Sequence, residues 1–147
     1  MSQSSIYPHD LSERTIRLLT IEPSPADSPI QWTFEERCLD DTSTPYYALS
    51  YCWGATGCPA QIVCNLYPFL VAANLYSVLL EYRRRGVIIP LWVDAVCINQ
   101  TNISERTTQV RMMRTIYSRA ACVLIWLGEA EATDDIALLL LKIMNAP

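Results

Sequence analysis

The sequence has few of the residues that build metal centres and nucleic-acid surfaces. It contains one histidine, His9, and its six cysteines form no C-x-x-C pair, which argues against a zinc site and a cysteine–histidine nucleophile. A net charge of −4 argues against nucleic-acid binding, because phosphates need a basic face. We interpret the one dense basic run, Arg83–Arg85, as a solvated helix end, with a phosphate or partner site as the alternative. No metal and no nucleic-acid partner is expected.

Targeting and membrane signals are equally scarce. The N-terminus lacks a positive region followed by an apolar one, and no apolar run reaches the ~18 residues of a membrane span. We therefore expect a cytoplasmic protein without a membrane span and with reduced cysteines. With 147 residues and 51% hydrophobic side chains, the chain can bury one core. We predict a disordered N-terminus over residues 1–14 and a single domain over 15–147.

The first half of the domain has the patterns of β-strands. A β-prone run over Thr15–Ile21 and an alternating run over Ile30–Arg37 predict an antiparallel ribbon at one edge. The continuous apolar run Tyr46–Cys52 predicts an interior strand covered on both faces. Residues 61–71 read as a small β-hairpin insertion. A helix is then expected from an N-cap at Asn74, and Gly86 supplies its stop.

The stretch from Leu91 to Gly128 has the pattern strand, loop, helix, strand. We predict strands over Leu91–Val96 and Ala121–Leu127 and a helix over Ser104–Ala120, with Ser104 as its N-cap. Such a βαβ unit places its two strands in parallel. A last helix is expected over Ile136–Met144. The fold class is therefore α/β, with a mainly parallel central sheet flanked by helices.

Polar residues cluster in the loop after the Leu91–Val96 strand, where open α/β sheets bind ligands. They are Asp94, Cys97, Asn99 and Gln100. A second loop, which begins with Trp53 and Gly54, would lie at the same edge if its strand is parallel to Leu91–Val96. That loop lacks the G-x-G-x-x-G spacing and the P-loop lysine, so an ordinary turn is the alternative to a phosphate cradle.

Several spaced blocks resemble the fungal heterokaryon-incompatibility (HET) domain. They cover roughly residues 15–128 and include the following segments: Ile16–Leu19, Tyr47–Gly54, Asn74-Leu75, Leu91–Gln100, Glu105-Arg106, Gln109-Val110, Met113, Ile116-Tyr117, Ala120 and Trp126–Gly128. The resemblance implies a death-inducing module in fungal non-self recognition, found as the N-terminal part of longer proteins. It also implies a homo-oligomer or other death-pathway proteins as partners.

HET domains are in turn remotely similar to Toll/interleukin-1 receptor (TIR) domains, which share a parallel α/β sheet. Some TIR domains cleave NAD with a glutamate at the carboxyl edge of the sheet, so the resemblance implies NAD as a substrate and no other cofactor. The TIR glutamate follows the third strand, beside a Trp-Cys pair. Here that segment is EAEATDDIA, which has no such pair. Glu129, Glu131 and Asp134 could substitute, but none matches residue by residue.

Two acids are our candidates for catalysis. An acid within an apolar strand needs partners or an open edge, so Asp94 is either a catalytic carboxylate or a structural acceptor for loop N–H groups or for Arg106. Glu105 is either the second acid or a helix-start charge. The candidates for ligand binding are Ser50, Trp53, Gly54, Cys97, Asn99, Gln100 and Arg106. Asn99 could instead tie its turn, and Trp53 could pack in the core. A non-enzymatic signalling module that oligomerises is the alternative function.

Overall fold

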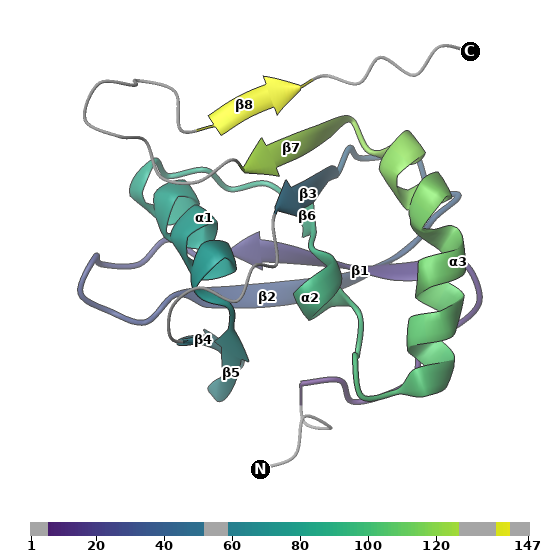
Figure 1. Ribbon diagram of the computed structural model, residues 1–147, viewed down its shortest axis with the longest axis horizontal. Helices are drawn as coiled ribbons and strands as arrows, with labels where there is room; N and C mark the ends of the chain where they lie inside the picture. Colours follow the sequence, from purple (N-terminus) through teal and green to yellow (C-terminus); the bar gives the residue numbers. More distant parts are fainter. Residues whose placement is uncertain (1–5, 52–58, 127–137, 142–147) are drawn as a thin grey trace.

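The computed structural model describes residues 6–51, 59–126 and 138–141 and has an α/β architecture (Figure 1). Within these residues, eight strands form one sheet in the order β5-β4-β2-β1-β6-β3-β7-β8, and three helices connect or follow them. The strands are β1 (Thr15–Ile21), β2 (Gln31–Cys38), β3 (Tyr47–Tyr51), β4 (Ala60–Cys64), β5 (Tyr67–Val71), β6 (Leu91–Trp92), β7 (Cys122–Trp126) and β8 (Leu138–Leu141). The helices are α1 (Ala73–Arg84), α2 (Asp94–Cys97) and α3 (Ile103–Arg119).

The sheet is mixed, so the prediction of a mainly parallel sheet is wrong. Strands β6, β3 and β7 are parallel neighbours, as is the pair β2 and β4, but the other neighbours run antiparallel. The physical reason is that β1 inserts between β2 and β6 and runs antiparallel to both. The predicted antiparallel pairing of β1 with β2 and the hairpin of β4 with β5 are confirmed. The predicted place of the ribbon at one edge is wrong, because β4 pairs with β2 and β6 pairs with β1 on its two sides.

Helix α1 confirms the predicted helix and buries one apolar face. Its buried residues are Leu75, Val78, Leu79 and Tyr82. The helix begins at Ala73, after an Ala72 cap that makes no side-chain hydrogen bond, so the predicted Asn74 cap is wrong. Gly86, with a φ of +67°, follows the end of the helix, as its left-handed tolerance predicts. No helix among the described residues is both long and apolar enough to cross a membrane.

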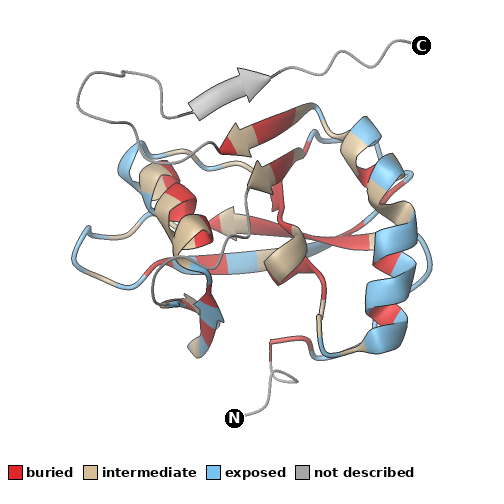
Figure 2. Ribbon diagram, viewed as in Figure 1, coloured by how far each residue is buried: buried red, intermediate tan, exposed pale blue. Residues whose placement is uncertain are grey.

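Helix α3 packs polar as well as apolar residues against the sheet. Its cap is Asn102, whose side-chain oxygen accepts the N–H of Glu105 at 3.1 Å, so the Ser104 cap is wrong. The buried residues are Glu105, Gln109 and Ile116, whereas Val110 is 54% exposed. Figure 2 shows buried patches on the side of α3 that faces the sheet and exposed residues on the outer side. The helix turns Glu105 and Gln109 toward the sheet because both side chains have hydrogen-bond partners across the core.

The predicted helix over Ile136–Met144 is wrong for its described part. Residues 138–141 form β8, an antiparallel partner of β7 with Leu124 opposite Leu140. A short apolar run fits a buried helix or a strand equally well, and leucine itself favours helices. Residues 138–141 form a strand because pairing with β7 satisfies the backbone N–H and C=O groups along one side of both strands.

The N-terminal segment packs on the core instead of being disordered in its described part. Ile6 and Tyr7 are buried, and the Tyr7 hydroxyl donates to the Val96 carbonyl at 2.6 Å. The Tyr7 ring lies 6.0 Å from Phe34 and 6.4 Å from Phe69, measured between centroids. The polar composition of residues 8–14 concealed this anchor, and residues 1–5 lie outside the described chain.

Candidate functional site

The site lies where the carboxyl ends of β3 and β6 meet. The two strands are parallel neighbours, so their ends share one edge of the sheet. After β3 the chain passes through β4, β5 and α1 before it reaches β6 on one side of β3. After β6 it passes through α2 and α3 to β7 on the other side of β3. Open α/β sheets bind ligands at such a reversal, because the diverging connections leave a crevice between them. The polar cluster predicted after the Leu91–Val96 strand belongs to this edge.

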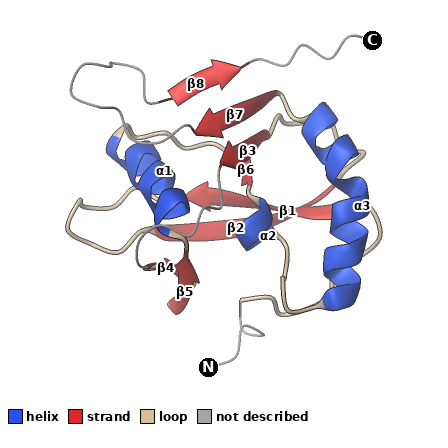
Figure 3. Cartoon of the chain, viewed as in Figure 1, coloured by secondary structure: helices blue, strands red, loops and turns tan. Residues whose placement is uncertain are grey.

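The end of β6 differs from the predicted strand over Leu91–Val96. Pairing stops at Trp92, and Asp94–Cys97 form the single turn of α2 (Figure 3). Asp94 is therefore the first residue of α2, half-buried, and not an acid in mid-strand. Its Oδ1 accepts the N–H of Ala95 at 2.8 Å, and Gln100 Nε2 donates to its carbonyl at 2.9 Å. The turn thus holds Asp94 and Gln100 together at the edge of the sheet.

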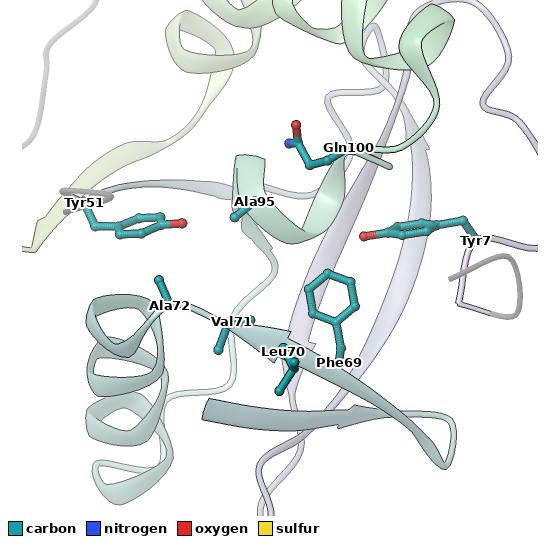
Figure 4. A pocket seen from close by; sticks show the side chains of 8 residues that line it. All are labelled: Tyr7, Tyr51, Phe69, Leu70, Val71, Ala72, Ala95 and Gln100. Carbon is teal, nitrogen blue, oxygen red and sulfur yellow. The ribbon is translucent and has the colours of Figure 1, made fainter. Parts of the chain in front are cut away.

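A pocket of about 260 Å³ opens at this edge (Figure 4). Its lining residues are Tyr7, Tyr51, Phe69, Leu70, Val71, Ala72, Ala95 and Gln100. The hydroxyls of Tyr7 and Tyr51 point toward each other from opposite sides, with the Gln100 amide on a third side. Aromatic walls with a few polar groups are typical of sites that bind a planar ring and fix its orientation. Of the predicted ligand-binding residues, Gln100 lines this pocket.

The carboxylate of Asp94 acts electrostatically on two tyrosines. Burial is the larger cause that raises the pKa of Tyr51 and Tyr117, and the charge of Asp94 raises both further, that of Tyr117 to about 12. Tyr51 lines the pocket, and so does Ala95, whose N–H donates to Asp94 Oδ1. At neutral pH both phenols stay protonated and can donate hydrogen bonds.

Glu105 forms a buried ion pair with Arg17, a residue 88 positions earlier in the chain. The two guanidinium nitrogens Nη1 and Nη2 donate to the two carboxylate oxygens at 2.9 and 2.8 Å, with side-chain exposures of 2% for Arg17 and 5% for Glu105. The N–H of Asn99 adds a hydrogen bond to Oε2 at 2.5 Å. Arg17 also donates to the carbonyls of Cys97 and His9. This network joins β1, the N-terminal segment, the loop after α2 and the first turn of α3.

Glu105 does not line the aromatic pocket. It contributes to a neighbouring polar pocket of about 180 Å³, together with Asn102 and Gln109. Gln109 donates through Nε2 to the Thr15 carbonyl at 2.9 Å. The carboxylate of Glu105 is neutralised by Arg17 and already accepts three hydrogen bonds. The geometry therefore favours a structural role for this acid.

The buried Cys97 side chain has no access to a ligand. Its exposure is 0%, and its Sγ accepts the N–H of Val93 at 3.3 Å. Burial raises the pKa of the thiol to about 12, so the nucleophilic thiolate is suppressed at neutral pH. Cys97 thus packs as a small apolar side chain inside the turn of α2. Within the described chain there is no group of three or more potential metal ligands.

The remaining candidates separate in space. Asn99 ties its own turn, since its Oδ1 accepts from the N–H and the hydroxyl of Thr101. Arg106 is exposed on α3, and Ser50 is half-buried in β3. Trp53 and Gly54 lie outside the described residues, as do the acids between 129 and 135. The edge of the sheet therefore brings together Asp94, Asn99 and Gln100 but leaves Arg106 outside.

Sequence reasoning missed the aromatic wall and the ion pair. Tyr7 and Phe69 come from segments read as a disordered terminus and a hairpin, and no local pattern links them to the edge of the sheet. Arg17 did carry a signal, because a charge inside the apolar run TIRLLTI must find a partner when the run is buried. That signal indicates a buried ion pair but does not identify its acid.

The comparisons with known proteins agree with the blocks seen in the sequence. The profile of a family described as "Heterokaryon incompatibility protein (HET)" matches residues 46–144. Heterokaryon incompatibility protein 6, OR allele, of Neurospora crassa is 41% identical over 103 residues. The match covers 61% of this chain and 15% of that relative, so the chain spans a small part of the longer protein. No solved structure matches the chain.

Proposed function

The chain belongs to the heterokaryon incompatibility (HET) family, and from this premise we propose that it serves as the HET module of a fungal non-self recognition protein. The observation that carries the proposal is the family match over residues 46–144, supported by the similarity to a heterokaryon incompatibility protein. The module acts in the cytoplasm and triggers death when incompatible cells fuse. Other parts of a longer protein would supply recognition.

Regulated expression in a fungal host tests this role. Induction of the chain should reduce viability within hours, measured by vital-dye uptake and colony counts, whereas an equally expressed unrelated α/β domain should not. Forced self-association through a fused dimerisation domain should increase killing if the module works by proximity. Normal growth of cells that contain folded protein, with and without forced association, would reject the death-inducing role.

The module kills by hydrolysing NAD or a related nucleotide, in the manner of some TIR domains. The pocket lined by Tyr51 at the end of β3, by β5 and by α2 supports this mechanism, because its aromatic walls suit a planar base. Its volume of about 260 Å³ is near the lower end of ligand pockets, which suits a ring with its sugar. Water adds to the ribose carbon, the bond to nicotinamide breaks with its electron pair going to nicotinamide, and a proton is released. The products are ADP-ribose and nicotinamide.

Asp94 is the acid that serves this reaction better than Glu105. It is hydrogen-bonded to two residues that line the pocket, Ala95 and Gln100, whereas Glu105 is held by Arg17 and Asn99. A carboxylate at this place can hold the ribose hydroxyls and stabilise the positive charge that develops on the sugar. Nicotinamide leaves as a neutral molecule, so the reaction needs no strong acid at the leaving group.

We expect Asp94→Asn to lower nicotinamide release from NAD by about 100-fold or more, because the substitution removes the charge but preserves the shape. Asp41→Asn is the matched control, since Asp41 is exposed and accepts a hydrogen bond from its own turn. Chromatography of the products measures release, and the thermal midpoint checks the fold. Full activity of Asp94→Asn would move the site, first to the acids at 129–135. No release from the wild type at high protein concentration would leave the non-enzymatic, oligomerising module.

A further inference from the structure

The outer face of α3 carries a surface that the core does not use. Ile103, Thr107, Val110 and Arg114 recur at spacings of four, three and four residues, which places them on one side of the helix. Ile103 is 70% exposed and Val110 is 54% exposed. This side is opposite the buried face of Glu105, Gln109 and Ile116, as the exposed outer side in Figure 2 shows.

The charges on this outer face have one sign. Arg106, Arg111 and Arg114 are exposed, and none makes a hydrogen bond or ion pair with a described residue. The only acid of α3, Glu105, is buried against Arg17. By contrast, the exposed arginines at the end of α1, Arg84 and Arg85, both pair with Glu81. The α3 face is therefore a cationic surface, unneutralised by the described residues, in a chain whose net charge is −4.

Apolar side chains bordered by arginines are typical of protein interfaces. Arginine is enriched in interface contacts because its flat guanidinium pairs with carboxylates and packs on apolar atoms. Ile103 and Val110 would supply the apolar contact, and the three arginines would select an acidic partner. We give this surface, Ile103, Arg106, Thr107, Val110, Arg111 and Arg114, the name α3 face.

This same chain contains a segment of matching chemistry. Between Leu127 and Ala137 there are four acids, Glu129, Glu131, Asp134 and Asp135, and no basic residue. The segment also contains Ile136 and Leu127, which match the apolar residues of the α3 face. Its charge of −4 opposes the +3 of the three arginines. A second copy of the chain therefore brings a complementary partner without any other protein.

We propose that the α3 face binds the acidic segment 127–137 of a second copy of this chain. The contact is heterologous, because it joins different surfaces of the two copies, and repetition of it builds an open chain of subunits. This inference rests on the alternative in the proposed function, a module that oligomerises, and it names the surface through which the copies bind. It concerns the purified protein, so it can fail while the death-inducing role stands, and the reverse also holds.

Sedimentation velocity over a range of protein and salt concentrations tests the contact. We expect the mean mass to rise with concentration at low salt and to fall toward that of the monomer at high salt, because exposed charges are screened. The variant Arg106→Gln/Arg111→Gln/Arg114→Gln should weaken association by about tenfold or more. Arg84→Gln/Arg85→Gln is the matched control, and it should assemble like the wild type.

A mixing experiment separates this contact from any other self-association. The second variant, Glu129→Gln/Glu131→Gln/Asp134→Asn/Asp135→Asn, keeps the α3 face but loses the charge of the segment. Each variant alone should stay monomeric, whereas their mixture should form a 1:1 dimer and stop there, since one intact face meets one intact segment. A strictly monomeric wild type, assembly unchanged in either variant, or a mixture without dimers would overturn the proposal. Binding of a monomeric wild type to phosphatidylserine vesicles through the α3 face would assign that face to membranes instead.

Discussion

Replacement of Glu105 by alanine is expected to lower the free energy of unfolding by about 3–5 kcal/mol, because it leaves the Arg17 guanidinium buried without its counter-charge. The side chain of Arg17 is 2% exposed, so water cannot replace the lost carboxylate without a rearrangement. The N–H of Asn99 also loses its acceptor. Urea denaturation followed by tryptophan fluorescence measures the change. A loss below about 1 kcal/mol would mean that the ion pair contributes little to the folded state.

A double replacement separates the role of the pair from that of its parts. Arg17→Met together with Glu105→Leu removes both charges and fills their volume with apolar atoms. Such exchanges are often neutral or stabilising, because desolvation of two charges offsets much of their attraction. We therefore expect the double variant to recover most of the stability that Glu105→Ala loses. It also gives the cleaner assay, since NAD hydrolysis in a folded double variant would exclude catalysis by Glu105.

Helices and strands could be predicted where the sequence pattern fits only one of the two. The α1 face and Gly86 follow from helical spacing and a left-handed stop, and the ribbon of β1 and β2 follows from β-prone and alternating runs. The end of β6 and strand β8 could not be predicted in this way. Apolar runs at Leu91–Val96 and Ile136–Met144 fit strand and helix, and only their neighbours in the sheet distinguish the two.

The candidate site could be located but not assembled from the sequence. The polar cluster after β6 predicted the edge where Asp94 and Gln100 lie together. The pairing of Arg17 with Glu105 spans 88 positions, so local periodicity carries no information about it. The same pair accounts for the exposure of Val110, because a buried glutamate turns the helix so that Val110 faces outward. The partners of buried polar groups therefore could not be predicted from the sequence.

Replacement of Tyr7 by alanine should destabilise the protein by about 3–5 kcal/mol, although Tyr7 comes from a segment that its composition assigns to a disordered terminus. The ring is buried against Phe34 and Phe69, and the Arg17 Cζ atom lies 4.7 Å from its centroid. Its removal leaves a cavity under the hairpin and takes the aromatic ring away from the Arg17–Glu105 pair. It also removes one wall of the aromatic pocket, which Tyr51, Phe69 and Gln100 line on other sides.

Tyr7→Phe is the control that separates the ring from its hydroxyl. It keeps the packing but loses the hydrogen bond to the Val96 carbonyl, so we expect a loss of about 1 kcal/mol. Because that bond joins the N-terminal segment to α2, Tyr7→Phe should also increase amide hydrogen exchange in residues 94–100, whereas exchange in α1 should stay unchanged. Equal stability of wild type and Tyr7→Ala would show that residues 6–14 do not anchor to the core in solution. In that case the pocket would be open on the side of Tyr7, and a chain shortened to begin at Thr15 would fold as well as the full one.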